Sequence, residues 1–97
     1  MKIFISQPMK GFSEEEIRYN REKAIKKIKN LYGDDVEIID SYINGDGTPL
    51  WYLGKSIELL STADLAYFLK GWNTARGCRI EYMCPENYGI GTYLEED

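Results

Sequence analysis

The sequence predicts a small doubly wound α/β domain, with a parallel sheet of about four strands and helices on both faces. Apolar runs of strand length alternate along the chain with segments of helical periodicity, which is the pattern of strand–helix–strand units. Two of the runs, Ile3–Ile5 and Leu65–Leu69, are apolar at consecutive positions, as expected of strands that are covered on both faces. A length of 97 residues suits one compact unit. We therefore expect a single domain over residues 1–97.

The first third of the chain predicts a strand, a loop and a long helix. Residues 2–6 form the strand, and Pro8 and Gly11 mark the loop that follows it. Ser13 and Glu16 have the spacing of a capping box, which places a helix start at Ser13. From there to about Gly33 the apolar residues recur on one side of the helix: Ile17, Ala24, Ile25, Ile28 and Leu31.

The remaining elements follow in the same alternation. We expect a second strand over residues 36–40, a loop over 41–49, a third strand over 65–69 and a last strand over 91–95. The helix before the third strand has apolar residues at spacings of three, four and three: Leu50, Leu53, Ile57 and Leu60. Another helix is predicted over residues 75–88, after a loop over 70–74.

The predicted topology selects one edge of the sheet for a ligand. Ligands of doubly wound sheets bind beyond the carboxyl ends of the strands, where the strand order reverses. The segments at that edge are residues 6–11, 40–41 and 70–77. Asp64 precedes its strand and so lies at the opposite edge, where we expect a turn residue.

Composition excludes several classes of function. A net charge of −4 argues against nucleic acid as a partner, and no apolar stretch is long enough for a membrane span. The chain has no histidine, which removes the commonest metal ligand and general base, so we expect no metal and no cofactor. Cys78 and Cys84 lie six residues apart in one predicted helix, and we expect two reduced thiols. These features predict a soluble, cytoplasmic protein.

Two segments indicate a family as well as a fold. The first strand is followed by Ser6-Gln7-Pro8-Met9-Lys10-Gly11, and the third strand begins after Ala63-Asp64 and is followed by Gly77-Cys78-Arg79-Ile80-Glu81. Both resemble segments of the nucleoside 2-deoxyribosyltransferase-like superfamily, which has a Rossmann-like fold and includes the 2'-deoxynucleoside 5'-phosphate N-hydrolases. The chain is particularly similar to a short branch of that superfamily described as a domain of unknown function.

The resemblance implies cleavage of the N-glycosidic bond of a deoxynucleoside or its 5'-monophosphate, by hydrolysis or deoxyribosyl transfer. Glu81 would be the nucleophile, and Lys10 matches the position of a cation in the hydrolases. Trp72 and Tyr67 are alternative candidates for stacking on the base. The other residues that the resemblance or their loop position assigns to the substrate are Ser6, Gln7, Gly11, Gly71, Arg76 and Gly77.

Departures from the family pattern leave other functions open. Ser56 stands where the family generally carries an aspartate, and Arg79 replaces a glycine two residues before the nucleophile. The general acid is not identified, and Asp40 is a candidate by position alone. The alternatives are a nucleotide-binding module without turnover and a small oligomeric interaction protein. The small core and the abundant aromatic residues predict a homodimer or larger homo-oligomer in any of these cases.

Overall fold

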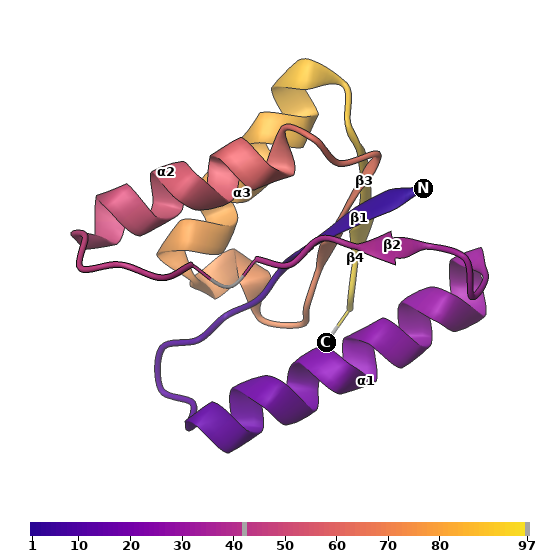
Figure 1. Cartoon of the computed structure of the whole chain (residues 1–97), viewed down its shortest axis with the longest axis horizontal. Helices are drawn as coiled ribbons and strands as arrows, with labels where there is room; N and C mark the ends of the chain where they lie inside the picture. Colours follow the sequence, from indigo (N-terminus) through magenta and orange to yellow (C-terminus); the bar gives the residue numbers. More distant parts are fainter. Residues whose placement is uncertain (42, 97) are drawn as a thin grey trace.

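The structure is a computed structural model, and it describes residues 1–41 and 43–96. Four strands alternate with three α-helices in the described part of the chain, with one short 3-10 turn before the last helix (Figure 1). The elements are β1 (Lys2–Ser6), α1 (Glu14–Tyr32), β2 (Glu37–Ile38), α2 (Pro49–Leu60), β3 (Leu65–Phe68), η1 (Trp72–Thr74), α3 (Arg76–Tyr88) and β4 (Gly91–Leu94).

The sheet is parallel throughout, in the order β2-β1-β3-β4. β1 pairs with β3 along its length, from Ile3 opposite Leu65 to Ser6 opposite Phe68. The chain moves from β1 outward to β2, returns across β1 to β3, and then continues to β4. The order therefore reverses between β1 and β3, and the predicted doubly wound fold is confirmed.

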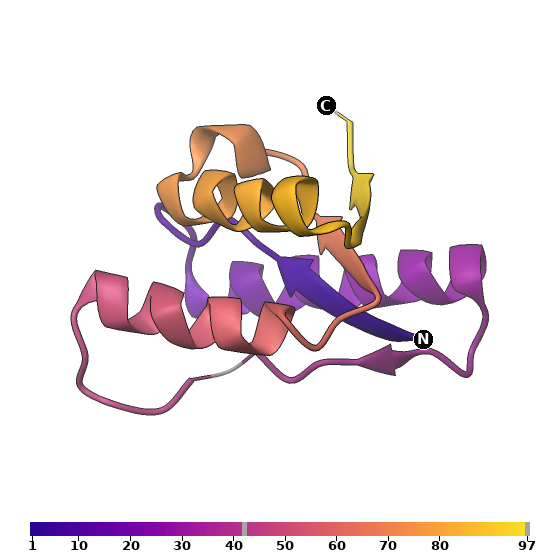
Figure 2. The same cartoon turned by 90° about the horizontal axis from the view of Figure 1, so that it is seen from above.

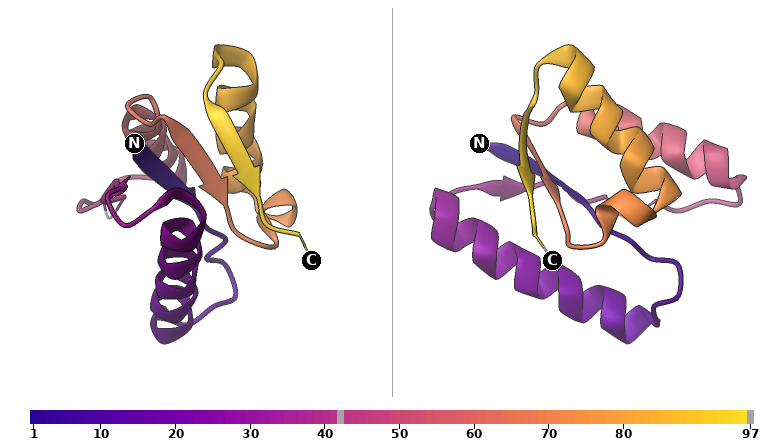
Figure 3. Two further views of the ribbon diagram at one scale, coloured as in Figure 1. Left: turned by 90° about the vertical axis from the view of Figure 1, so that its right-hand side faces the viewer. Right: turned by 180° about the vertical axis from the view of Figure 1, so that it is seen from behind.

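The two faces of the sheet explain the apolar runs in the sequence. Ile3 and Ile5 of β1 join the core cluster that includes Ala24 and Ile28 of α1. Phe4, between them, joins the second cluster, on the face that α2 and α3 cover. Because side chains alternate across a strand, covering both faces requires apolar residues at successive positions. Figures 2 and 3 show α1 on one side of the sheet and α2 and α3 side by side on the other.

The helix boundaries follow from their caps. Ser13 and Glu16 form the predicted capping box, with Oγ of Ser13 accepting from the Glu16 amide and the Glu16 carboxylate accepting from the Ser13 amide. Thr48 caps α2, and Pro49 follows in the first turn, where its missing N–H costs nothing. Gly89 ends α3 with a φ of 76°, which favours glycine.

Several details differ from the predictions. Leu31 and Leu50 were expected on apolar stripes, but they are 49% and 74% exposed. Leu31 lies in the last turn of α1, where its neighbour Tyr32 packs against the core instead, and Leu50 lies in the first turn of α2, whose buried residue is Leu60 in the last turn. β2 has two residues rather than five, because its ladder with β1 covers only Lys2 and Ile3. No helix in the described residues is both long and apolar enough to cross a membrane.

Candidate functional site

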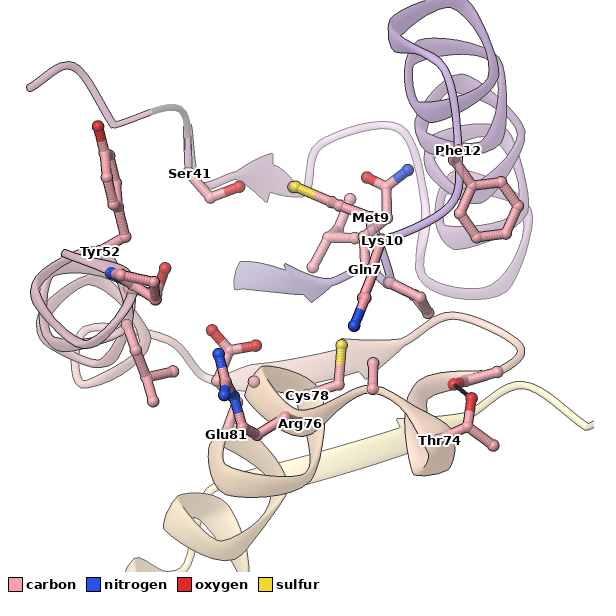
Figure 4. Close-up of a pocket in the computed structure, with 18 of the residues that line it drawn as sticks. Gln7, Met9, Lys10, Phe12, Ser41, Tyr52, Thr74, Arg76, Cys78 and Glu81 are labelled. Carbon is pink, nitrogen blue, oxygen red and sulfur yellow. Dashed lines mark hydrogen bonds between the residues drawn. The ribbon is translucent and has the colours of Figure 1, made fainter. Parts of the chain in front are cut away.

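A cavity of about 750 Å³ opens at the carboxyl ends of β1 and β3, where the strand order reverses (Figure 4). Its walls come from the β1–α1 loop, the start and middle of α2, the β3–α3 segment and the first two turns of α3. The polar and charged residues that line it are Gln7, Lys10, Ser41, Tyr52, Ser56, Lys70, Thr74, Arg76, Cys78 and Glu81. This volume is within the usual range for small-molecule sites.

Glu81 lies in α3 and faces this cavity. Its side chain is only 8% exposed, and Figure 4 shows the carboxylate pointing into the cavity from the α3 side. Glu81 Oε1 accepts a hydrogen bond of 2.7 Å from Oγ of Ser6, the last residue of β1. Burial raises the pKa of Glu81 above its ordinary value, and the hydrogen bond from Ser6 opposes part of that rise.

Ser6 and Cys78 complete the surroundings of Glu81. Ser6 does not line the cavity; it is buried beneath it and orients the carboxylate. Cys78 lies one helical turn before Glu81, and its thiol points into the cavity (Figure 4). Burial raises the pKa of Cys78 to about 11, so the thiol is protonated and a weak nucleophile at neutral pH. Cys78 and Cys84 are both free cysteines, as predicted.

Three cationic side chains line the same cavity. Lys10 comes from the β1–α1 loop, Lys70 lies two residues after the end of β3, and Arg76 begins α3. The Lys10 side chain extends across the cavity toward α3 (Figure 4). Lys70 lies within a loop that the sequence placed at the ligand edge, but only the structure singles it out. Against these three cations, Glu81 is the one carboxylate that lines the cavity among the described residues.

The structure brings some of the other predicted residues to the cavity. Ser56, half-buried in α2, lines it, and so do Gly71 and Gly77. Gln7 also lines it, but its amide turns toward α1 and donates to the carbonyl of Ile17 at 2.7 Å, so this side chain braces the loop.

Other predicted residues lie outside the cavity lining. The Trp72 ring packs against Phe68 and Tyr82, at centroid distances of 5.5 and 4.7 Å, which places it in the core of the α3 face. Asp40 is exposed beyond β2, and Gly11 turns the chain before α1 with a φ of 88°.

Two further expectations concern residues that flank the motifs. Arg79, which stands in place of a glycine of the family pattern, is exposed on α3 and does not line the cavity. Asp64 is a turn residue at the opposite edge of the sheet, as predicted, and its carboxylate accepts from the Lys2 amide at 2.7 Å.

Several residues that line the cavity had no role predicted from the sequence. Ser41 and Tyr52 form the wall on the α2 side, and the Tyr52 hydroxyl bonds to the carbonyl of Gly45. Thr74 lies on the opposite wall, where its hydroxyl donates to the carbonyl of Gly71. Ser41 belongs to the segment 40–41 that the carboxyl-end rule placed at this edge, but no role was predicted for it. Nothing in the sequence pattern distinguishes Tyr52 from the other residues of α2. Within residues 1–41 and 43–96, no group of three or more acidic or cysteine side chains could hold a metal ion.

Comparison with known proteins places the chain in a family. A family model described as a domain of unknown function, DUF4406, matches residues 1–93. The chain belongs to DUF4406. The match includes β1, β2, β3, all but the last residue of β4 and every residue that lines the cavity, so the cavity is part of the DUF4406 domain itself. Searches of curated proteins and of solved structures found no match.

Proposed function

We propose that this DUF4406 domain cleaves the N-glycosidic bond of a 2'-deoxynucleoside or its 5'-monophosphate, with Glu81 as the nucleophile. The observation that carries the proposal is the buried Glu81 carboxylate, which faces a cavity of nucleotide size and is oriented by Ser6. Burying a carboxylate costs free energy that hydrogen bonds offset only in part, and acids with a perturbed pKa in cavities are typical of functional sites. The resemblance to the deoxyribosyltransferase-like superfamily supplies the reaction type.

The reaction proceeds in two displacements. The Glu81 carboxylate attacks the anomeric carbon, and the bond to the base nitrogen breaks with its electron pair going to the base, which takes up a proton. Water then attacks the same carbon and loses a proton, and the bond to Glu81 breaks with its electrons returning to the carboxylate. A second base in place of water would give deoxyribosyl transfer.

The charges around the cavity favour the 5'-monophosphate over the nucleoside. Lys10, Lys70 and Arg76 give the lining more positive than negative charge, although the whole chain carries a net charge of −4. Cations that point into a cavity attract a phosphate and bind it through charge-assisted hydrogen bonds. The phosphate is therefore a second anchor for the substrate, separate from the reacting carbon at Glu81.

The direct test is an assay for free base. We expect the purified chain to release base from at least one member of a panel of deoxynucleosides and their 5'-monophosphates. Release of no base from any of them would contradict the proposed activity.

A second candidate function is a nucleotide-binding module without turnover, and Ser56 favours it. Ser56 lines the cavity at the position where the related enzymes generally carry a carboxylate. The chain therefore has no carboxyl at this position to protonate the leaving base. Stabilisation by the same nucleotides in a thermal-shift assay, without release of base, would support this candidate.

Association of the chain with itself is a separate proposal. Leu50 of α2 and Ile80 and Met83 of α3 are exposed apolar side chains on helices that lie side by side. Burying these side chains between two copies would remove apolar surface from water. Light scattering should therefore give a mass of at least twice the monomer's 11.2 kDa, and a monomer at high concentration would contradict this.

A further inference from the structure

Glu95 directly follows β4 and joins the ends of two strands. Its carboxylate accepts two hydrogen bonds, at 2.5 Å from the Tyr67 hydroxyl and at 2.8 Å from the Lys70 amide. Its own amide donates to the carbonyl of Phe68 at 2.9 Å. Three bonds therefore connect Glu95 to the end of β3, at the point where the chain leaves the sheet toward the cavity.

The Tyr67 hydroxyl is a constant donor in this arrangement. Tyr67 is completely buried, and its ring stacks in parallel on Tyr93 of β4 at a centroid distance of 5.0 Å. Burial is the larger cause and the hydrogen bond to Glu95 the next in raising the pKa of Tyr67 far above its ordinary value. The hydroxyl therefore keeps its proton at any physiological pH. Glu95 is thus held against a rigid part of the core.

Lys70 is the first residue of the segment that forms one wall of the cavity. Lys70, Gly71, Thr74 and Ala75 line the cavity, and η1 lies within this segment. The segment is a compact turn: the Thr74 amide and hydroxyl both donate to the carbonyl of Gly71, which has a φ of 89°. A turn that is bonded to itself moves as one piece, so its position depends on how it is attached to β3.

We propose that Glu95 is a positioning residue for the site: its carboxylate fixes the cavity wall formed by residues 70–75. This inference rests on the proposed function for its effect on turnover, but not for its effect on the wall. Glu95 itself does not line the cavity. Its removal acts on the substrate only through Lys70, Gly71 and Thr74, so binding of the substrate weakens more than the chemical step slows.

Hydrogen exchange tests the positioning directly. In Glu95→Ala, we expect the amides of residues 70–75 to exchange at least about tenfold faster, while the amides of β1 and α1 keep their wild-type rates. Glu95→Gln retains one acceptor oxygen, and its exchange rates at residues 70–75 should lie between those of wild type and Glu95→Ala. Glu96→Ala, at the exposed neighbouring glutamate, is the matched control and should leave the exchange unchanged. Unchanged exchange at residues 70–75 in Glu95→Ala would overturn the proposal.

Kinetics then separate this inference from the proposed function. With a 2'-deoxynucleoside 5'-monophosphate as the probe, Glu95→Ala should raise KM by about tenfold and change kcat less than threefold. An unchanged KM, or an equal loss in kcat, would overturn the positioning role. If Glu95→Ala does not fold, Tyr67→Phe removes one of the two bonds and should produce the same pattern on a smaller scale. A wild-type chain that releases no base would contradict the proposed function, and the exchange experiment would still decide the role of Glu95.

Discussion

Ser6 Oγ and Glu81 Oε1 lie 2.7 Å apart, although the two residues are separated by 75 positions in the sequence. The contact joins the carboxyl end of β1 to the second turn of α3 beneath the cavity. A hydroxyl that donates to a carboxylate stabilises its ionised form, which is the form required of a nucleophile. Ser6 therefore holds Glu81 in place and partly offsets the cost of its burial.

The first prediction is a change in the pH profile of Ser6→Ala. Loss of the hydrogen bond from Ser6, which favours the charged form, raises the pKa of Glu81 further. Glu81 must be ionised to attack, so kcat rises as pH rises through this pKa, and the acidic limb of the profile should move to higher pH. Ser61→Ala, at an exposed serine after α2, is the control. A uniform loss of kcat at every pH, with no shift of the limb, would contradict the role given to Ser6.

The second prediction concerns stability and pH. The pKa of Glu81 is raised in the folded chain, so its protonated form contributes stability that is present below the ordinary carboxyl pKa and lost as pH rises through the raised value. Glu81→Gln removes this titration. The variant should therefore gain free energy of unfolding relative to wild type as pH rises, by about 1.4 kcal/mol for each unit of the shift.

Urea unfolding at several values between about pH 4 and about pH 8 measures this effect. Glu22→Gln, at an exposed glutamate of α1, is the control and should parallel the wild-type curve. If the Glu81→Gln curve also runs parallel to wild type, the carboxylate is not destabilised by burial.

The third prediction concerns the leaving base. In Ser56→Asp the new carboxyl would share the cavity with Glu81. Repulsion between the two carboxylates would raise the pKa of the new carboxyl, so that it can protonate the leaving base. Base release should become at least about tenfold faster, since general acids typically contribute more than this. Ser56→Asn has the same shape without an acidic proton and should not accelerate the reaction. Equal rates for the two variants would show that a missing acid is not the limit.

The fourth prediction separates binding of the phosphate from chemistry. Lys10→Met should raise KM for a deoxynucleoside 5'-monophosphate by about tenfold, which corresponds to about 1.4 kcal/mol of binding. It should leave KM for the corresponding nucleoside unchanged, because the nucleoside has no phosphate that Lys10 could contact. Lys26→Met, on the exposed side of α1, is the control. Equal effects on both substrates would mean that Lys10 does not bind the phosphate.

Local patterns predicted the elements of this fold well, because each depends on neighbouring residues. The apolar run Leu65–Leu69 gave a buried strand, and the spacing of Ser13 and Glu16 gave the start of α1. The same periodicity did not show that Leu31 and Leu50 are exposed, since that depends on which side and which part of each helix packs against the sheet.

The candidate site was predictable in its location but not in its contacts. The order of strands and helices was sufficient to place residues 6–11 and 70–77 at one edge. The direction of a side chain depends on packing between distant segments, so the bond between Ser6 and Glu81, the bracing of the loop by Gln7 and the inward packing of Trp72 were not visible in the sequence. Glu95 escaped notice for the same reason, since its partners lie on another strand.

The rate of base release by Glu81→Gln tests the central proposal most directly. Glutamine keeps the shape of glutamate and can still accept the hydrogen bond from Ser6, but it cannot form the covalent bond to the sugar. We predict that Glu81→Gln folds, binds the deoxynucleoside 5'-monophosphate as wild type does, and releases base at least about a thousandfold more slowly. Glu22→Gln should keep the wild-type rate. Release of base by Glu81→Gln at the wild-type rate would contradict the assignment of Glu81 as the nucleophile.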